Sequence, residues 1–516
     1  MIMSITNTTP IHRPAPGFRS HAQRILDHAV AQPTRVVLQD GQRQITARQL
    51  DHAVRGMAHR FAAEGVQAGC VVALAAPVSI EAIVARYAAT LLGCITTLCP
   101  NPTVPDRLAE FLQLVEADVL ICFPGARTAA EAASVQAGMP ALLHVEPLTP
   151  EDLAGHASDE GRDATDYPVA AAARAALVTS GGTTGGVKAS HFTFEQWTHT
   201  VDTGPCPERR QLICTSLAHV SQAHVDQTLL GGGRIVLLEH FSPGDVLRTI
   251  GAERITHLCL VEPLLVKLAD HPDVEHRDLS SLVAISHIGA DASASLCRRL
   301  LGRLGVRPAH AYGASEVGII SLLDSRHYQV TEPDRLDTCG RPLDGVDVRI
   351  ERADGTAAAA GEEGLIVVHS IRRAGGYVGS ADQSAFRPDG WYATGDLGCL
   401  DVDGFLHVRG RARDRRDVDG VAVMPLDVQE ALCSHPAVRY AVTIPAAIQG
   451  DGFDALVLLE PAAKLTVDEL RADIRTRYGP HLVPRVLAVA DRVPVTEQGK
   501  PDRREIREVL DLARPE

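Results

Sequence analysis

The chain has 516 residues, of which 45% are hydrophobic, and its formal net charge is −14, from 50 Lys and Arg against 64 Asp and Glu. This length predicts about three domains, or one large and one small domain, and the acidic balance argues against nucleic acid or an anionic membrane as the main partner. Because no run of about 18 apolar residues occurs and residues 1–20 lack the apolar core of a signal peptide, we expect a cytoplasmic protein without a membrane span.

Strand-like runs and helical patterns alternate along the first 130 residues. We expect these strands and helices at residues 36–38, 48–64, 71–75 and 80–92. Thr46 is the expected N-cap of the first helix. The alternation predicts a largely parallel sheet that is covered on both faces. Residues 123–172, rich in Ala, Gly, Pro and acidic side chains, have the composition of a variable surface segment.

Further strand and helix signals follow, and the pattern changes near Asp401. We expect the next elements at residues 235–238, 246–251, 257–261 and 262–270. Around Asp401, short strands separated by Asp-Gly turns at 389–390 and 403–404 lead into a compact final unit. In this unit Thr466 and Glu469 form a capping box that begins a helix ending near Tyr478. We therefore predict a large domain over residues 1–413 and a small domain over residues 414–516.

The cysteines and histidines indicate neither a disulfide framework nor a zinc site. The 11 cysteines are dispersed without any Cys-x-x-Cys pair. The 22 histidines show no His-x-x-x-His spacing. This distribution is typical of reduced cysteines in a protein core.

A glycine-rich segment at residues 179–189 is the most informative local pattern. It reads Thr-Ser-Gly-Gly-Thr-Thr-Gly-Gly-Val-Lys-Ala and follows the apolar run 175–178. Glycines let backbone N–H groups approach an anion closely, and hydroxyl groups add hydrogen-bond donors, so we predict a polyphosphate-binding loop. The alternative is an ordinary connection between a strand and a helix. Because Lys188 does not directly follow a glycine, the segment is not a Walker A loop.

Four further segments, together with this loop, resemble motifs of the adenylate-forming superfamily in order and spacing. They are Tyr-Gly-Ala-Ser-Glu at 312–316, Gly-Trp-Tyr-Ala-Thr-Gly-Asp at 390–396, Gly-Arg-Ala-Arg-Asp at 410–414 and Pro-Val-Thr-Glu-Gln-Gly-Lys at 494–500. Lesser matches are Gly-Arg-Pro at 340–342 and Gly-Tyr at 376–377. The resemblance extends over nearly the whole chain. The superfamily contains acyl- and aryl-CoA synthetases, peptide-synthetase adenylation domains and luciferases, and this chain resembles its acid-ligase branch most.

This resemblance implies an α/β fold. The large N-terminal domain would hold doubly covered sheets and a distorted β-barrel subdomain, and the C-terminal domain would be a small mobile α+β unit. The implied reaction uses ATP and Mg²⁺. A carboxylate attacks the α-phosphate to form acyl-AMP, pyrophosphate leaves, and the developing charge requires preorganised positive groups.

The resemblance also assigns roles to individual residues. Lys188 would contact the outer phosphates, Ser315 would bind phosphate, Glu316 would hold Mg²⁺ as a hard oxygen ligand, and Lys500 would bridge the attacking carboxylate and the α-phosphate. Tyr312 would stack on adenine, Asp396 would bind the ribose hydroxyls and Arg411 would contact ribose or phosphate. The implied nucleotide-binding set is Thr179, Ser180, Gly181, Gly182, Thr183, Thr184, Gly185, Tyr312, Gly313, Asp396 and Arg411. By residue type alone, these side chains could instead be core, turn or surface residues.

Asp414 resembles the hinge residue of the superfamily. In these enzymes the small domain rotates after adenylation, Lys500 would leave the site, and another face of the small domain would line a tunnel for the acceptor thiol. Hinges concentrate such a change in a few backbone dihedrals.

The segment at residues 218–222 resembles acyl-CoA synthetases more than amino-acid-activating enzymes, which place an aspartate at its start. The implied substrate pocket contains His219, which would lie near the carboxylate and gate the pocket, together with Ser221, Gln222, Gly289, Ala290 and Ala314. If residues 222–227 form a helix, Gln222 and Asp226 share one face, and one of them would bind a polar substituent. The alternative is a solvated helix face. We expect a small-molecule acid, either an aryl acid or a polar-substituted acyl acid.

The acceptor stays open at this level. Val187 and Ala189 differ from the usual proline and glycine around the loop lysine. Asp417 and Asp419 stand where CoA ligases often carry lysines, and carboxylates repel a polyanionic cofactor, although three nearby arginines offset this charge. CoA, the phosphopantetheine arm of an acyl carrier protein and a nitrogen nucleophile are the candidates, and the last includes nitrite activation for N–N bond formation on an aryl amine. A catalytically inactive binding protein is a third class of function, which the motif residues disfavour.

Overall fold

The computed structural model describes residues 17–139, 141–155, 168–180, 188–288, 293–306, 308–323, 333–379, 382–446, 452–496 and 498–513. The chain forms two compact units. The first unit comprises Met1–Phe241 and Ile371–Gln383, and the second comprises Ser242–Ser370 and Ser384–Glu516.

One sheet of the first unit is built around parallel strands, as the sequence predicts. Its order is β18-β8-β7-β4-β3-β5-β6. The strands are β3 (Val71–Ala75), β4 (Ile95–Leu98), β5 (Val119–Cys122), β6 (Ala141–His144), β7 (Arg174–Ser180), β8 (Lys188–Thr193) and β18 (Gly376–Tyr377). β8 and β18 add antiparallel to one edge, so the glycine segment joins two antiparallel strands and not a strand and a helix. Helices α5 (Pro105–Leu114) and α6 (Arg127–Ala137) bury their apolar side chains against this sheet.

The other strands of the first unit follow the order β9-β10-β1-β2. They are β9 (Arg210–Ile213), β10 (Arg234–Leu237), β1 (Val36–Asp40) and β2 (Arg43–Thr46). Thr46 then caps α3 (Ala47–Ala63) through a capping box with Gln49, which confirms the predicted helix start. Helix α4 (Ile80–Leu91) is buried along its whole length and packs beside α3.

The interpretation of residues 123–172 as a surface segment was wrong for α6, whose inner face is buried, whereas most other described residues of this region are exposed or half-buried. This region contains α6, strand β6 and the short helix α7 (Pro150–Ala154). Ala129, Ala130 and Ala133 are buried because alanine is a strong helix former whose small side chain fits close against the sheet. An alanine-rich composition thus concealed a packed helix.

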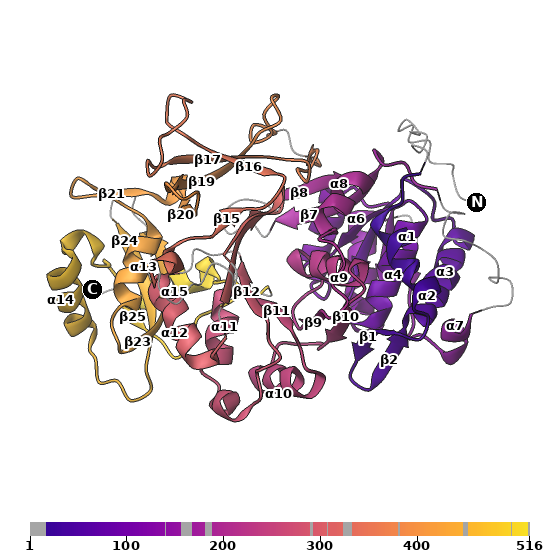
Figure 1. The fold of residues 1–516 in the computed structure, drawn as a ribbon, viewed down its shortest axis with the longest axis horizontal. Coiled ribbons are helices and arrows are strands. Elements are labelled where there is room, and N and C mark those ends of the chain that lie inside the picture. Colours follow the sequence, from indigo (N-terminus) through magenta and orange to yellow (C-terminus); the bar gives the residue numbers. More distant parts are fainter. Residues whose placement is uncertain are drawn as a thin grey trace. The chain divides into compact units, whose positions relative to one another are not determined.

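The second unit begins with a sheet segment that continues into antiparallel strands (Figure 1). Its strands are β11 (His257–Leu260), β12 (Ala284–Ile288), β13 (Pro308–Ala314), β14 (Gly318–Leu323) and β15 (Arg341–Pro342). The first three are parallel, and β14 and β15 are antiparallel to their neighbours. Helices α10 (Pro243–Glu253), α11 (Glu262–Ala269) and α12 (Ala294–Leu304) accompany these strands.

A four-stranded antiparallel sheet lies where the distorted barrel is expected. Its order is β16 (Val346–Glu351), β17 (Gly364–Ser370), β19 (Tyr392–Leu400) and β20 (Leu406–Arg411). Its apolar face, including Ile366 and Val368, packs in one cluster with Tyr312 and Ala314 from the end of β13. This packing brings β13, β19 and β20 together at one place.

The last hundred residues have a hydrophobic core of their own. Their elements are β21 (Arg416–Val418), β22 (Val421–Val423), α13 (Pro425–Cys433), β23 (Val438–Pro445), β24 (Phe453–Leu459), α14 (Val467–Tyr478), β25 (Leu487–Val489) and α15 (Arg503–Leu512). Thr466 and Glu469 form the predicted capping box of α14. The domain boundary at Asp414 stays a prediction, because the second unit contains residues from both sides of it.

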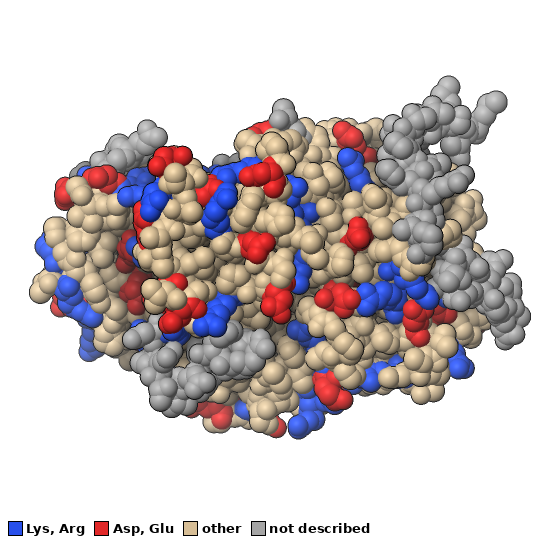
Figure 2. Space-filling model, turned by 45° about the horizontal axis from the view of Figure 1, so that its top comes forward, with Lys and Arg blue, Asp and Glu red and all other residues tan. Residues whose placement is uncertain are grey.

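Two properties of the described surface bear on possible partners. On the face drawn in Figure 2, lysine and arginine side chains are interspersed with aspartate and glutamate. Among the described residues, no helix is both long enough and apolar enough to cross a bilayer.

Candidate active site

Three of the predicted nucleotide-binding residues meet in the second unit. Tyr312 lies near the end of β13, and Asp396 and Arg411 pair across β19 and β20. The Tyr312 hydroxyl donates to Asp396 Oδ2 at 2.6 Å, and Arg411 Nε lies 3.1 Å from Asp396 Oδ1. Arg411 also donates to the carbonyl oxygen of Thr394 at 2.7 Å. The fold therefore brings together residues that are distant in the sequence.

The protonation of this trio follows from its burial. Burial raises the pKa of the Asp396 carboxyl group, against the opposing effects of Arg411 and the Tyr312 hydroxyl. Burial, and secondly the charge of Asp396, holds the pKa of Tyr312 well above its ordinary value. Tyr312 therefore keeps its proton at neutral pH and donates it to the carboxylate.

The turn after β13 carries the predicted phosphate and magnesium residues. Gly313 is needed here because a Cβ atom would lie 2.5 Å from the carbonyl oxygen of Gly318 on the paired strand. Val317 N–H closes the turn on Ala314 O at 3.1 Å, and Ser315 and Glu316 lie within it. The Glu316 side chain is buried, and its negative charge is one of those that raise the pKa of Arg411.

The buried carboxylate of Glu316 is a suitable ligand for Mg²⁺ that enters the site bound to ATP. Mg²⁺ usually takes one or two protein carboxylates and completes its six ligands with phosphate oxygens and water. Among the described residues, no group of three or more His, Cys, Asp and Glu side chains could hold a metal by itself. Glu316 is therefore the residue that would hold the ion, with the phosphates supplying further ligands.

Lys500 joins the same neighbourhood. Its turn is closed by Thr496 N–H donating to Lys500 O at 2.7 Å and by Gly499 N–H donating to Thr496 O at 2.8 Å. Gly499 has φ +80°, and a Cβ atom there would lie 2.6 Å from Leu264 on α11. Burial lowers the pKa of Lys500, and the charge of Arg411 lowers it further. The positive charges of Lys500 and Arg411 therefore oppose each other, and a bound anion would relieve this repulsion.

Polar contacts join residues 430–460 to the region of α11 and α12. Arg299 lies between Asp270 at 2.6 Å and Glu460 at 3.1 Å, and Arg439 also pairs with Asp270 at 3.1 Å. Elsewhere on the same helices, Tyr440 donates to Glu262 at 3.0 Å and Ser295 donates to Glu430 at 2.5 Å. Half-buried pairs of this kind are screened less by salt than exposed ones.

The predicted hinge residue is buried and paired. Asp414 ends a short 3-10 turn, Ala412–Asp414, and its Oδ2 lies 3.1 Å from Arg503 on α15. Sequence reasoning did not single out Arg503. The residues around Arg503 do not indicate that it pairs with Asp414, because Asp414 lies 89 residues earlier in the chain.

The first unit contributes a second group of predicted residues. His219 is the N-cap of α9 (Val220–Leu230) and has φ +64°, a left-handed conformation that is uncommon outside glycine. Its Nδ1 lies 2.6 Å from the carbonyl oxygen of Thr179, so Nδ1 carries the proton and donates it. This bond ties α9 to the end of β7, next to the glycine segment.

Lys188 begins β8, paired with Ser180 of β7, and its ammonium lies 4.6 Å from the ring centroid of Tyr377. Gly181, Gly182, Thr183, Thr184, Gly185, Gly289 and Ala290 lie outside the described residues. The predictions for these positions therefore stay predictions.

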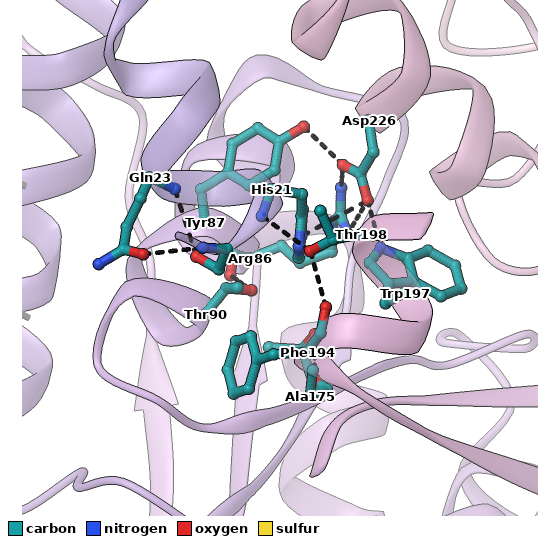
Figure 3. A network of polar contacts seen from close by, with 12 residues as sticks. His21, Gln23, Arg86, Tyr87, Thr90, Ala175, Phe194, Trp197, Thr198 and Asp226 are labelled. Atoms are coloured by element: carbon teal, nitrogen blue, oxygen red, sulfur yellow. Dashed lines mark hydrogen bonds and ion pairs between the residues drawn. The ribbon is translucent and has the colours of Figure 1, made fainter. Parts of the chain in front are cut away.

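Helix α9 is buried, which excludes the alternative of a solvated helix face. Ser221 and Gln222 are buried, and the Ser221 hydroxyl lies 3.2 Å from that of Thr215. Asp226 is fully buried and accepts hydrogen bonds that leave it no role toward a substrate substituent, which corrects the second candidate on this face (Figure 3). Gln222 remains the candidate for a polar contact.

The Asp226 network joins three helices to α9. Arg86 donates to both carboxylate oxygens, Tyr87 donates at 2.6 Å and Trp197 Nε1 donates at 2.8 Å, with His21 Nε2 at 3.7 Å (Figure 3). Burial alone would raise the pKa of Asp226, but Arg86 and the other donors hold it below its ordinary value. Burial lowers the pKa of His21 to about 4, so this ring is neutral.

Sequence reasoning missed this network although one signal was present. Arg86 stands inside the apolar run that forms α4, and a charged side chain in a buried helix requires a buried partner. The partner could not be named, because 140 residues separate Arg86 from Asp226.

Comparisons with known proteins show the family of this chain. The profile of the AMP-binding enzyme family matches residues 26–378, and that of the AMP-binding enzyme C-terminal domain matches residues 427–500. A feruloyl-CoA synthase from Amycolatopsis is 30% identical over 487 residues, which cover 92% of this chain and 96% of that protein. Medium/long-chain-fatty-acid–CoA ligase FadD8 from Mycobacterium tuberculosis is 34% identical over 310 residues, and the match covers 58% of this chain and about half, 54%, of that ligase.

A solved structure extends the likeness to the whole fold. Amide bond synthetase McbA from Marinactinospora thermotolerans superposes with a TM-score of 0.82 at 28% identity, over 95% of this chain and 99% of that chain. From its matched motifs, its fold and these relatives, the chain belongs to the AMP-binding enzyme family, the adenylate-forming superfamily of acyl- and aryl-acid ligases.

Proposed function

We propose that the protein adenylates an aryl or polar-substituted carboxylic acid with ATP and then transfers the acyl group to a thiol, either CoA or a carrier-protein phosphopantetheine arm. The observation that carries this proposal is the meeting of Tyr312, Asp396, Arg411 and Lys500 in one unit. The 30% sequence identity with feruloyl-CoA synthase, over 92% of this chain, supports an aryl acid as the substrate class.

In the first half-reaction, a carboxylate oxygen of the acid attacks the α-phosphorus of ATP. The bond between this phosphorus and the oxygen bridging to the β-phosphate breaks, and pyrophosphate leaves. Lys500 and Arg411 would stabilise the negative charge that develops on the phosphoryl oxygens, while Asp396 and Tyr312 orient the nucleoside. Magnesium held by Glu316 would neutralise charge on the phosphates.

In the second half-reaction, the thiolate attacks the acyl carbonyl and AMP leaves. In the proposed cycle, Lys500 leaves the nucleotide and the small domain turns about Asp414. The contacts of Glu262, Asp270 and Arg299 with the last segment would have to break during this motion.

A nitrogen nucleophile is the second candidate acceptor. The hairpin of β21 and β22 carries Asp417 and Asp419, where a basic side chain would favour CoA, and Asp417 accepts a hydrogen bond from Gly420 N–H at 2.9 Å. Carboxylates attract an ammonium and repel a polyphosphate. The likeness to an amide bond synthetase supports this alternative, which also includes nitrite activation for N–N bond formation on an aryl amine.

A pyrophosphate-release screen tests both proposals. The purified chain is given MgATP with aryl, alkenoyl and amino acids and with nitrite, each alone and with CoA, with holo-carrier protein, or with an aryl amine. We expect acid-dependent release with an aryl acid, and a thioester when thiol is present. An amide or N–N product without thiol dependence would establish the second candidate, and no release with any acid or oxyanion would contradict both.

A further inference from the structure

The two-residue strand β18 is held on β8 by backbone hydrogen bonds that extend one residue beyond each of its ends. Gly375 N–H donates to His191 O at 2.9 Å, and Val378 N–H donates to Ala189 O at 2.8 Å. The side-chain amide of Gln383 then binds both backbone groups of Tyr377, accepting from its N–H at 2.9 Å and donating to its carbonyl at 3.0 Å. The backbone of Tyr377 is therefore fixed from both sides.

The two glycines before Tyr377 permit this close approach. A Cβ atom on Gly375 would lie 2.2 Å from the His191 ring. Gly376 has φ +147°, and a Cβ atom there would lie 2.9 Å from Gln383 Oε1. A side chain at either position would displace His191 or Gln383. The two glycines therefore allow the segment to lie close against β8 and to place the Tyr377 ring there.

Tyr377 is 8% exposed, and the face of its ring meets the ammonium of Lys188. The distance of 4.6 Å from Nζ to the ring centroid lies within the range of a cation–π interaction. Lys188 is the first residue of β8, and β8 is the strand on which β18 is fixed. The same strand pairing therefore sets the positions of both the cation and the ring.

An aromatic face holds a cation differently from a carboxylate. A carboxylate would neutralise the ammonium and compete with phosphate for it, whereas a ring attracts the ammonium and restricts the side chain without carrying a negative charge. A free lysine side chain loses considerable rotamer entropy when it is ordered by a ligand, and a lysine that is already restricted loses less.

We propose that Tyr377 is a positioning residue for adenylation: its ring holds the Lys188 ammonium in the orientation that receives the outer phosphates of ATP. This inference rests on the proposed function through the role of Lys188. It adds Tyr377 to the residues that serve ATP binding. It predicts that substitutions of Tyr377 change the binding of ATP and leave the binding of the acid unchanged.

The first test compares variants of Tyr377 by their KM for MgATP and for the acid in pyrophosphate release. Tyr377→Leu is expected to raise the KM for MgATP by about three- to tenfold, in line with the strength of a cation–π contact, and to leave the KM for the acid unchanged. Tyr377→Phe keeps the ring and is expected to retain the wild-type KM. Tyr478→Leu, which removes a ring 5.0 Å from Arg477 in the final segment, is the matched control.

A double-mutant cycle separates positioning from packing. In a Lys188→Ala background, Tyr377→Leu should produce no further change in the Kd of MgATP, measured by calorimetry without acid. If Tyr377 acted only through packing, the same fold-change would recur in both backgrounds, and this result would overturn the proposal. Tyr377→Met, which fills more of the ring volume, replaces the leucine variant if that protein does not fold.

The cycle also distinguishes two kinds of failure. A wild-type chain that does not bind MgATP contradicts the proposed function itself. A wild-type chain that binds MgATP, with effects of Tyr377 and Lys188 that multiply independently, contradicts only the positioning role.

Discussion

The Tyr312 hydroxyl and the Asp396 carboxylate form a 2.6 Å hydrogen bond although 84 residues separate them in the chain. Asp396 uses one oxygen for Tyr312 and the other for Arg411. Asp396, which is expected to bind ribose, is therefore oriented by Tyr312 and Arg411. Conservative substitutions can test each of these contacts separately.

Tyr312→Phe tests the hydrogen bond while keeping the ring that would stack on adenine. A hydrogen bond to a charged group contributes about 1.5–3 kcal/mol, so we expect the Kd of MgATP to rise by about ten- to a hundredfold. Calorimetric titration measures this change. The control is Tyr478→Phe, which removes a 2.8 Å hydroxyl contact to Ser434 in the final segment and should leave nucleotide binding unaltered. An equal effect of both variants would indicate general destabilisation.

The pH profile of adenylation tests Lys500. Because burial and Arg411 lower its pKa, Lys500 loses its proton at a lower pH than the ordinary value of 10.5, and adenylation should decline correspondingly early on the alkaline side. In the window between the lowered and the ordinary pKa, the folded state binds fewer protons than the unfolded state, so the contribution of Lys500 to unfolding free energy rises with pH. Lys500→Arg should abolish this alkaline limb, whatever rate remains. A limb that persists in the arginine variant would assign it to another group.

Lys500→Ala separates the two half-reactions. We expect pyrophosphate release to fall to background, because the charge between carboxylate and α-phosphate is lost, while the hydrolysis of supplied acyl-AMP continues. Rapid-quench assays of each half-reaction measure the two rates. Near-normal adenylation by this variant would refute the assigned role.

Asp414→Pro tests the hinge, with the structure supplying its control. Proline restricts φ and also removes the carboxylate that pairs with Arg503 at 3.1 Å, whereas Asp414→Asn removes only the charge. We expect the proline variant to retain adenylation and to lose acyl transfer, and the asparagine variant to keep the ratio of the two rates. The ratio of pyrophosphate to final product measures this partition, and an equal loss of both steps in the proline variant would exclude a hinge at this position.

Asp226→Ala tests the buried network through stability. Removing the carboxylate leaves the Arg86 guanidinium buried without its partner, which costs about 3–5 kcal/mol of unfolding free energy. Glu146→Ala removes one partner of the exposed pair with Arg127 and should cost less than about 1 kcal/mol. Denaturant titration of both variants measures the difference, and comparable values would mean that Arg86 finds another partner.

Much of the fold could be predicted from local patterns. The N-cap at Thr46 and the capping box at Thr466 predicted two helix starts, and the apolar runs at β3, β10 and β11 predicted those strands. Such features depend on neighbouring residues, which the sequence displays directly.

Contacts between distant segments could not be predicted in this way. The burial of α9 and the pairing of Asp226 with Arg86 arise from tertiary packing, and a polar helix segment by itself suggests solvent. The Gly-Tyr pair at 376–377 was visible only as a minor motif, because its contact with Lys188 depends on the pairing of β18 with β8.

The Asp226 network sets a condition for redesigning the proposed substrate pocket. Helix α9 carries Ser221 and Gln222, yet the charge of its Asp226 is neutralised by Arg86 from α4. Trp197 from α8 (Phe194–Val201) and His21 from α1 (His21–Leu26) also contact this carboxylate. Transplanting α9 alone from a relative would import or remove a buried charge without its counterpart. Exchange of substrate specificity between relatives should therefore succeed when these four helices are transferred together.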